Sequence, residues 1–237
     1  PDGIGVGYHA AENDRERSMV ETQAKPATFF IRNVPVQGDA ILAPMDGFSD
    51  WPFRSLCRAL GSAMSVTEFI KSEYLVRAFA RMEPRMRFDE SERPVGIQVY
   101  GENVEEILKA ALLVQTKKPD FIDINLGCPA KSVVHYGAGV GMMRTPLKVA
   151  RLFRRLEAAL EVPVTAKIRL GWEDFRSYKL IARIVEENGG ALIAVHGRTK
   201  NQGYTGEADW EAIADVKAAV KIPVIGNGDV KMVADIQ

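Results

Sequence analysis

The chain has 237 residues, of which 46% are hydrophobic and 26% are charged, so it is long enough to bury one large core. Its 31 basic and 31 acidic residues give a net charge of zero, which excludes the bulk positive field of a non-specific nucleic-acid binder but leaves room for a local basic patch. Two cysteines are too few for a disulfide framework, and no stretch reaches the ~20 apolar residues needed to cross a membrane. These features predict a soluble cytoplasmic protein.

The N-terminal part of the chain leads into the first predicted core strand. Residues 1–28 are polar and show no lasting apolar period, so we expect a tail there. Phe29–Ile31 and Val34–Val36 are predicted to be short strands that close the bottom of a barrel. Residues 40–43 form an apolar run that is predicted to be the first core strand and to end at Pro44.

A helix is predicted directly after the polar turn that follows this first strand. Asp50 or Ser49 is its predicted N-cap, because both side chains can accept a hydrogen bond from the first turn. The apolar residues that share one face of the helix are Phe53, Leu56 and Leu60.

From residue 63 onward, short apolar strands alternate with helical patterns of crossover length. This alternation predicts parallel strands, because a helix separates each strand from the next. The strands predicted after the first are 63–67, Val95–Tyr100, 121–124, Val164–Arg169, Leu192–His196 and Val224–Asn227. Polar groups end most of these strands, whereas a doubly wound sheet would gather its ligand at one switch point. The prediction is therefore an α/β fold, a (β/α)8 TIM barrel that is incomplete, with seven of its eight strands present.

Side chains that carry chemistry end four of the predicted strands, namely Cys128, Lys167, His196 and Asn227. In a parallel barrel these strand ends lie on one face, so we expect the four side chains to meet. Cys128 sits in a Gly-Cys-Pro turn and indicates a nucleophile or a proton donor, or else a residue that the turn geometry alone requires. Cys57 lies within a helical apolar pattern and is interpreted as a small buried hydrophobe.

The other three strand ends also leave alternatives open. A lysine in a barrel mouth needs an anionic partner, so Lys167 indicates a phosphate or an electron-rich ring edge as ligand, or a structural ion pair. His196 is interpreted either as a catalytic residue or as a structural one. Asn227-Gly228-Asp229 ends the seventh predicted strand, where barrels often bind a phosphate through backbone N–H groups.

Two further patterns are interpreted as structural. Residues 137–141 are glycine-rich but lie well beyond the strand end, so we expect a flexible loop over the site rather than a phosphate loop. No set of His, Cys and Asp residues has metal-ligand spacing, and no metal site is predicted.

Six motifs stand in a specific order along the chain, and one of them reads Asp-Ile-Asn-Leu-Gly-Cys-Pro. They occupy residues 43–50, 97–101, 123–129, 167–172, 196–199 and 227–229. With these motifs the chain closely resembles the tRNA-dihydrouridine synthases, flavin enzymes that reduce a uridine in tRNA. The resemblance covers the chain from about Phe30 to its end.

The resemblance implies FMN as cofactor, NADPH as reductant and tRNA as partner. In the implied reaction, reduced flavin gives a hydride to C6 of the uracil, and Cys128 protonates C5. Gln98 and Lys167 would hydrogen-bond the flavin ring, and residues 227–229 would approach its phosphate. The full implied cofactor set is Pro44, Met45, Asp46, Gln98, Lys167, His196, Asn227, Gly228 and Asp229. The residues implied to donate to the substrate are Asn125 and Arg198.

The resemblance also predicts how the chain is divided. Residues 29–237 correspond to the FMN-binding barrel domain, without its last strand and without the Gly-Arg pair that holds the FMN phosphate in the family. By the same resemblance, we expect residues 1–237 to lack the C-terminal helical domain that helps the family grip tRNA. Two alternatives stay open: another FMN barrel reductase that acts on a small molecule, and an inactive RNA-binding fragment.

Overall fold

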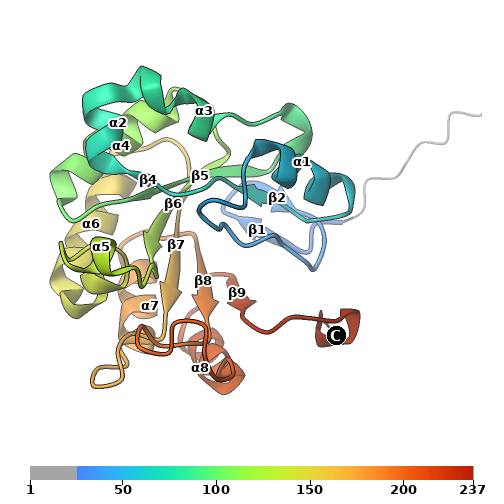
Figure 1. Ribbon diagram of the computed structural model, residues 1–237, viewed down its shortest axis with the longest axis vertical. Coiled ribbons are helices and arrows are strands. Elements are labelled where there is room, and N and C mark those ends of the chain that lie inside the picture. Colours follow the sequence, from blue (N-terminus) through green and yellow to red (C-terminus); the bar gives the residue numbers. More distant parts are fainter. Residues whose placement is uncertain (1–25, 237) are drawn as a thin grey trace, which may run out of the picture.

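A curved parallel sheet forms the centre of the computed structural model, which describes residues 26–236 (Figure 1). Its strands follow one another in chain order, and each pairs in parallel with the next. The short strand β4 (Ile70–Lys71) pairs in parallel with the end of β5. The main path of the sheet runs through β3 (Ser65–Val66), β5 (Val95–Tyr100), β6 (Phe121–Leu126), β7 (Val164–Arg169), β8 (Leu192–His196) and β9 (Val224–Asn227).

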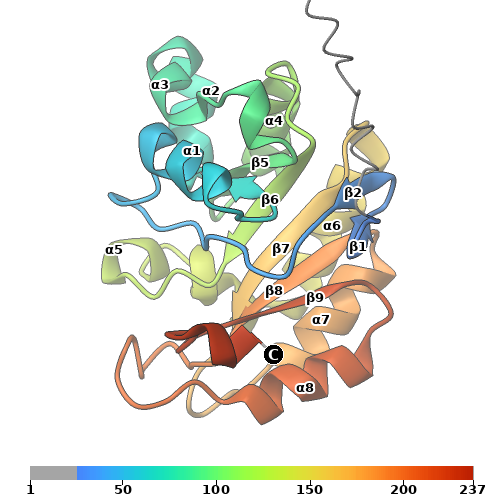
Figure 2. The ribbon, with the colours of Figure 1, turned by 90° about the vertical axis from the view of Figure 1, so that its right-hand side faces the viewer.

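Helices connect the successive strands and line up along the sheet (Figures 1 and 2). The crossovers that follow β5 to β8 are α4 (Val104–Gln115), α6 (Pro146–Ala159), α7 (Tyr178–Glu187) and α8 (Trp210–Ala219). This arrangement confirms the predicted α/β fold, an incomplete parallel barrel. The shorter helices are α1 (Trp51–Ala59), α2 (Ser72–Ala78), α3 (Glu83–Met86), α5 (Lys131–Val134), and the 3-10 helices η1 (Phe79–Met82), η2 (Glu90–Glu92), η3 (Gly139–Arg144) and η4 (Val233–Ile236). Within residues 26–236, no helix combines the length and the apolar character that a membrane span requires.

Local sequence decides where the crossover helices begin and which side they bury. The Asn103 side chain accepts hydrogen bonds from the N–H groups of Glu105 (2.9 Å) and Glu106 (3.1 Å), and so caps α4. Pro146 stands in the first turn of α6, where no N–H is needed. The buried residues of α6 are Val149, Leu152, Phe153 and Leu156. Their spacing of three and four residues turns one stripe of the helix toward the sheet.

An antiparallel hairpin covers the end of the sheet at which the strands begin. It consists of β1 (Phe29–Ile31) and β2 (Val34–Val36), which confirms the two short strands predicted there. Ile31 is fully buried in one cluster with Phe121 and Leu192, the first residues of β6 and β8. Figure 2 shows the hairpin at this end and α5 at the opposite end, where the polar strand ends lie.

The predicted first core strand is wrong, because residues 40–43 form no ladder in the described structure. Ala40 O accepts a hydrogen bond from Ala63 N (2.8 Å), and Leu42 N donates to Ser62 Oγ (3.0 Å). Six of the seven predicted core strands are therefore formed. In a closed barrel, every strand pairs with a neighbour on each side. Within residues 26–236, the last strand, β9, pairs with β8 alone, and residues 40–43 pair with no strand.

Helix α1 has the predicted cap, but its apolar face is largely exposed. The Asp50 carboxylate accepts a hydrogen bond from Phe53 N (3.1 Å), which confirms Asp50 as the N-cap. The apolar residues of this face, at 40%, 55% and 80% exposure, are Phe53, Leu56 and Leu60. The buried residue of α1 is Arg54, so a charged group anchors this helix.

Arg54 forms a buried ion pair with Glu92 of η2. Its Nε lies 2.9 Å from Glu92 Oε1, and both side chains are at most 2% exposed. The guanidinium also donates to Ser49 O (3.0 Å) and Arg87 O (2.7 Å). The pair therefore fixes the loop before α1 against the segment that leads to β5.

We predict that Glu92→Gln lowers the free energy of unfolding by about 3–5 kcal/mol, because it leaves the buried Arg54 charge uncompensated. The double variant Arg54→Met/Glu92→Leu should recover most of this loss, since it removes both charges. As a control, Arg151→Ala, which breaks an exposed pair with Glu105, should change the free energy by at most about 1 kcal/mol. Urea unfolding measures all three, and equal effects of Glu92→Gln and Arg151→Ala would contradict the prediction.

Candidate functional site

The carboxyl ends of β6 to β9 bring the predicted residues to one rim. The register of the sheet sets Asn125 beside Lys167, and His196 beside Asn227. Cys128 follows the end of β6 by two residues. The structure therefore collects a thiol, an amine, an imidazole and two amides at the rim, as the strand ends predicted.

A buried amide holds the Cys128 turn. Asn125 Oδ1 accepts hydrogen bonds from the backbone N–H groups of Gly127 (3.1 Å) and Cys128 (2.9 Å). Its Nδ2 donates to Gln98 Oε1 at 2.9 Å. Asn125, implied to contact substrate, is thus engaged on both sides of its amide and keeps one N–H for a ligand.

The same chain of hydrogen bonds ends at a carboxylate that was not predicted as a site residue. Gln98 Nε2 donates to Asp123 Oδ2 (2.6 Å), and Thr165 Oγ1 donates to Asp123 Oδ1 (2.5 Å). Burial raises the pKa of Asp123, while these two donors and the charge of Lys167 act in the opposite direction. The signal in the sequence is the two-residue period of β6, which sets Asp123 on the same face as Asn125.

The Cys128 thiol is protonated at neutral pH. Burial raises its pKa above the ordinary value of 9.0, although a backbone hydrogen bond at Ala130 and the charge of Arg169 oppose this rise. A neutral thiol can donate a proton, whereas a nucleophile requires the thiolate. The electrostatics of the site therefore favour the proton donor over the nucleophile.

Lys167 is a cation whose polar partner is an amide. Its Nζ donates to Asn227 Oδ1 at 3.2 Å, and within residues 26–236 it forms no ion pair. Part of the side chain faces a cavity of about 50 Å³ that Pro44 and Asn227 also line. Burial nevertheless lowers the pKa of Lys167 to about 8, while the charge of Asp123 raises it. The cation thus remains free to face a ligand.

His196 is a neutral imidazole among cations. Burial lowers its pKa to about 3, and the charges of Arg169, Lys167 and Arg198 add to this effect. Arg198 Nη1 lies 3.2 Å from His196 Nε2. Because a guanidinium can only donate, Nε2 accepts, and the ring proton belongs on Nδ1.

Arg198 and Asp229, implied to contact substrate and cofactor, contact each other. The Arg198 guanidinium donates to both carboxylate oxygens of Asp229, at 2.8 and 2.7 Å, and also to Gly206 O (2.7 Å). The hydrogen bonds from Arg198 and from Ala208 N, with the positive charge of Arg198, lower the pKa of Asp229. Arg198 is 5% exposed, so this pair joins the loop after β8 to the turn after β9.

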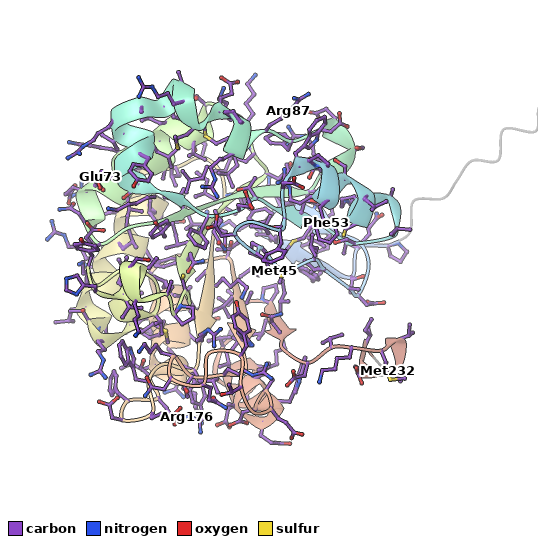
Figure 3. The ribbon with its side chains drawn as sticks, viewed as in Figure 1. Met45, Phe53, Glu73, Arg87, Arg176 and Met232 are labelled. Atoms are coloured by element: carbon purple, nitrogen blue, oxygen red, sulfur yellow. The ribbon has the colours of Figure 1, made fainter. Side chains whose placement is uncertain are left out.

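The three residues implied to line FMN from the first loop lie in different surroundings. Pro44 lines the cavity beside Lys167 and Asn227. Met45, labelled in Figure 3, is 40% exposed on the loop before α1. Asp46 forms an ion pair with Arg85. The structure therefore brings Pro44 to the buried part of the site and Asp46 to its surface.

The donor set fits the ring end of a flavin. Gln98 Nε2 keeps one N–H beyond its bond to Asp123, and Lys167 supplies a cation, a pair of donors that suits the carbonyl and nitrogen acceptors of a pyrimidine edge. At the implied phosphate end, Arg198 and Lys231 both face the Asp229 carboxylate. The described residues therefore match the ring half of FMN better than its phosphate half.

The glycine-rich segment is a packed element, which corrects the expected flexible loop. Residues 139–144 form η3, with Val140, Met142 and Met143 buried. Val140 N donates to Cys128 O at 3.2 Å. Gly139 has φ of +54°, and a Cβ there would lie 2.7 Å from Cys128 O, so only glycine lets η3 approach the thiol turn.

Two further rim residues were missed by the sequence analysis. Arg169 is 3% exposed and donates to Thr199 O (3.1 Å) and Gly203 O (2.6 Å). Its guanidinium lies 5.4 Å from the ring of Tyr204, which is 80% exposed. Arg169 shares the two-residue period of Lys167 and could have been found from it, whereas Tyr204 stands in a loop without periodic signal.

A basic groove adjoins the Cys128 turn. Its volume is about 520 Å³, and its lining residues are Lys131, Ser132, Val134, His135, Tyr136 and Lys200. Lys71 Nζ lies 5.5 Å from the Tyr136 ring, and Lys200 Nζ lies 4.9 Å from the Trp172 ring. The groove contains no lining carboxylate, so it is a local basic patch on a chain of zero net charge.

Comparisons with known proteins match the chain to one family. The family model "Dihydrouridine synthase (Dus)" matches residues 41–237. The chain is 43% identical over 191 residues to "tRNA-dihydrouridine synthase B" of Xanthomonas campestris pv. campestris, covering 80% of this chain and 58% of that protein. The protein of the same name in Pseudomonas aeruginosa is 42% identical over 193 residues, with the same two coverages.

A "Probable tRNA-dihydrouridine synthase" of Aquifex aeolicus is 41% identical over 208 residues, covering 85% of this chain and 64% of that protein. The chain thus spans about three fifths of the length of these curated relatives. Among solved structures, a nitroalkane oxidase from Streptomyces ansochromogenes aligns at 16% identity with a TM-score of 0.40, covering 79% of this chain and 57% of that chain, which is too low to bear on the fold.

We predict that the stability of the protein falls as the pH drops from 6.5 toward 3, and that His196→Gln reduces this fall. The unfolded chain protonates His196 near pH 6.5, whereas the folded chain holds its pKa at about 3, so acid favours unfolding through this window. Urea unfolding at pH 7 and pH 5 measures the difference. His135→Gln, at an exposed position, is the matched control. An unchanged pH dependence in His196→Gln would contradict the prediction.

Proposed function

The chain belongs to the dihydrouridine synthase family, and on this premise we propose that its protein reduces the C5–C6 double bond of a uridine in tRNA. NADPH is the proposed reductant and FMN the proposed cofactor, as the resemblance implies. The observation that carries the proposal is the half-buried thiol of Cys128 after the end of β6, whose pKa burial raises and which lies within the electrostatic influence of the Lys167 cation.

Four groups of residues are proposed to hold the cofactor. Pro44, which lines the cavity beside Lys167, would line it together with Met45 and Asp46 from the loop before α1, and Gln98 and Lys167 would donate to its ring. His196 and residues 227–229 complete the set toward the phosphate. When bound, FMN supplies the hydride for C6 of the uracil.

The chain itself is proposed to contribute a proton to the reaction and to hold the group that donates this proton in place. Addition at C6 leaves enolate-like charge on the uracil, which a proton at C5 neutralises. Cys128 is the proposed source of that proton, because its pKa is raised and the Asn125 amide fixes its turn. Lys167 and the free N–H of Asn125 supply positive potential to the same charge.

The basic groove supports an RNA substrate over a small molecule. Lys131 and Lys200 line the groove together with Tyr136, which is 61% exposed, and Lys131 follows Cys128 by three residues. A chain of phosphates with stackable bases fits such a surface, whereas a free pyrimidine would leave it unused.

We predict that Cys128→Ala slows tRNA reduction at least ~10²-fold and leaves NADPH-driven flavin bleaching nearly unchanged, because a positioned acid serves the second step alone. Stopped-flow absorbance and dihydrouridine content of the tRNA measure the two steps. Cys57→Ala in α1 is the matched control and should be neutral.

The same assay separates the competing outcomes. Equal losses in both steps would make Cys128 structural, and a wild-type protein that bleaches its flavin without forming dihydrouridine would refute the proposed function. Since the thiol pKa lies above 9.0, its capacity to donate should persist through neutral pH and decline only in alkali.

We predict that Lys131→Ala and Lys200→Ala each raise the Kd for a tRNA transcript and reduce the slope of log affinity against log salt by about one, because each removes a phosphate contact. Flavin bleaching by NADPH should not change. Lys109→Ala, exposed on α4, is the control. If Lys109→Ala weakened tRNA binding as much as the groove variants do, the groove would contribute no more than any other surface charge, and the prediction would be wrong.

A further inference from the structure

We propose that Asp123 is a positioning residue whose carboxylate fixes the direction of the hydrogen bonds that hold the Cys128 turn. The inference rests on the proposed role of Cys128 as proton donor. Asp123 is 4% exposed and lies at the far end of the relay that joins Gln98, Asn125 and the Cys128 N–H.

The direction of the relay follows from what each group can do. Each oxygen of Asp123 faces a donor, Thr165 Oγ1 at Oδ1 and Gln98 Nε2 at Oδ2, and a carboxylate held by two donors only accepts, so Oδ2 requires Nε2 of Gln98 to face it. Gln98 Oε1 then faces Asn125 and accepts from its Nδ2. Asn125 in turn directs Oδ1 at the N–H groups of Gly127 and Cys128, which can only donate.

Without an acceptor-only group at position 123, only the N–H groups of Gly127 and Cys128 still select the direction of the two amides. In Asp123→Asn, the new side chain can either accept from Gln98 or donate to it, so the relay can run both ways. In the reversed relay, Asn125 turns its NH2 group toward the N–H of Cys128, and two buried donors face each other. The carboxylate therefore selects the arrangement that holds the thiol turn.

A variant of Thr165 is the control that distinguishes this role of Asp123 from a role in packing alone. Thr165 donates to the other oxygen of Asp123 and is equally buried, but it lies outside the path to Cys128. Thr165→Val should therefore leave the direction of the relay unchanged. The double variant Asp123→Asn/Gln98→Glu moves the carboxylate one step along the relay. It should restore the original direction of the hydrogen bonds, because the carboxylate at position 98 can only accept from Asn125 Nδ2.

The test is amide hydrogen exchange at Gly127 and Cys128 in the purified protein without substrate, with Asn125→Ala as the reference for complete loss of the acceptor. Asp123→Asn should lower the protection of both amides roughly tenfold, toward that of Asn125→Ala, while amides of β8 stay protected. Thr165→Val should retain the protection, and Asp123→Asn/Gln98→Glu should regain it. Unchanged protection in Asp123→Asn, an equal loss in Thr165→Val, or no recovery in the double variant would overturn the inference.

A second readout applies to catalysis. Asp123→Asn should lower kcat for tRNA reduction by roughly tenfold or more, with the KM for tRNA unchanged, since the proton donor and not the RNA surface is disturbed. If Asp123→Asn fails to fold, Gln98→Leu interrupts the relay one step later, and unchanged protection there overturns the inference. Absence of tRNA reduction in the wild type refutes the proposed function alone, because the exchange result does not depend on activity.

Discussion

The register of the parallel sheet is the constraint on which the whole site depends. β6, β7, β8 and β9 pair so that Asn125 lies beside Lys167, and His196 beside Asn227. Because side chains alternate along each strand, a slip of one residue in any ladder would turn that strand's polar groups away from the barrel interior. The apolar cluster of the hairpin with Phe121 and Leu192 holds the opposite end of the same strands. Packing at the bottom therefore sets the chemistry at the rim.

Burial then decides which of the rim groups are charged. It raises the pKa of the Cys128 thiol and lowers the pKa of His196, so both are neutral at pH 7. Lys167, with a pKa of about 8, keeps most of its charge at that pH with the help of Asp123. The site thus combines a neutral thiol with a cation, which suits the proposed reaction, in which negative charge forms and is then neutralised.

Much of this arrangement could be predicted, because strand ends and two-residue periods are local signals. Cys128, Lys167, His196 and Asn227 were found in this way, and six of the seven core strands are formed. Residues 40–43 carry a strand-like pattern, but no ladder forms along them. The bond between Arg198 and Asp229 joins residues 31 positions apart, and no local pattern encodes such a pairing. No local pattern encodes the packing of η3 against Cys128 either. For this reason a flexible loop was predicted where the structure has a buried element.

The proposed role of Cys128 as proton donor has two requirements, and different parts of the fold meet them. Desolvation keeps the proton on sulfur, which calls for closely packed neighbours, and Gly139 allows η3 to come into contact with the turn. Position calls for directed hydrogen bonds, and Asn125 supplies two of them to the backbone of the turn. Apolar packing alone would give the first without the second, since it is not directional. The polar relay through the barrel interior is therefore compatible with burial only because each of its buried groups has a partner.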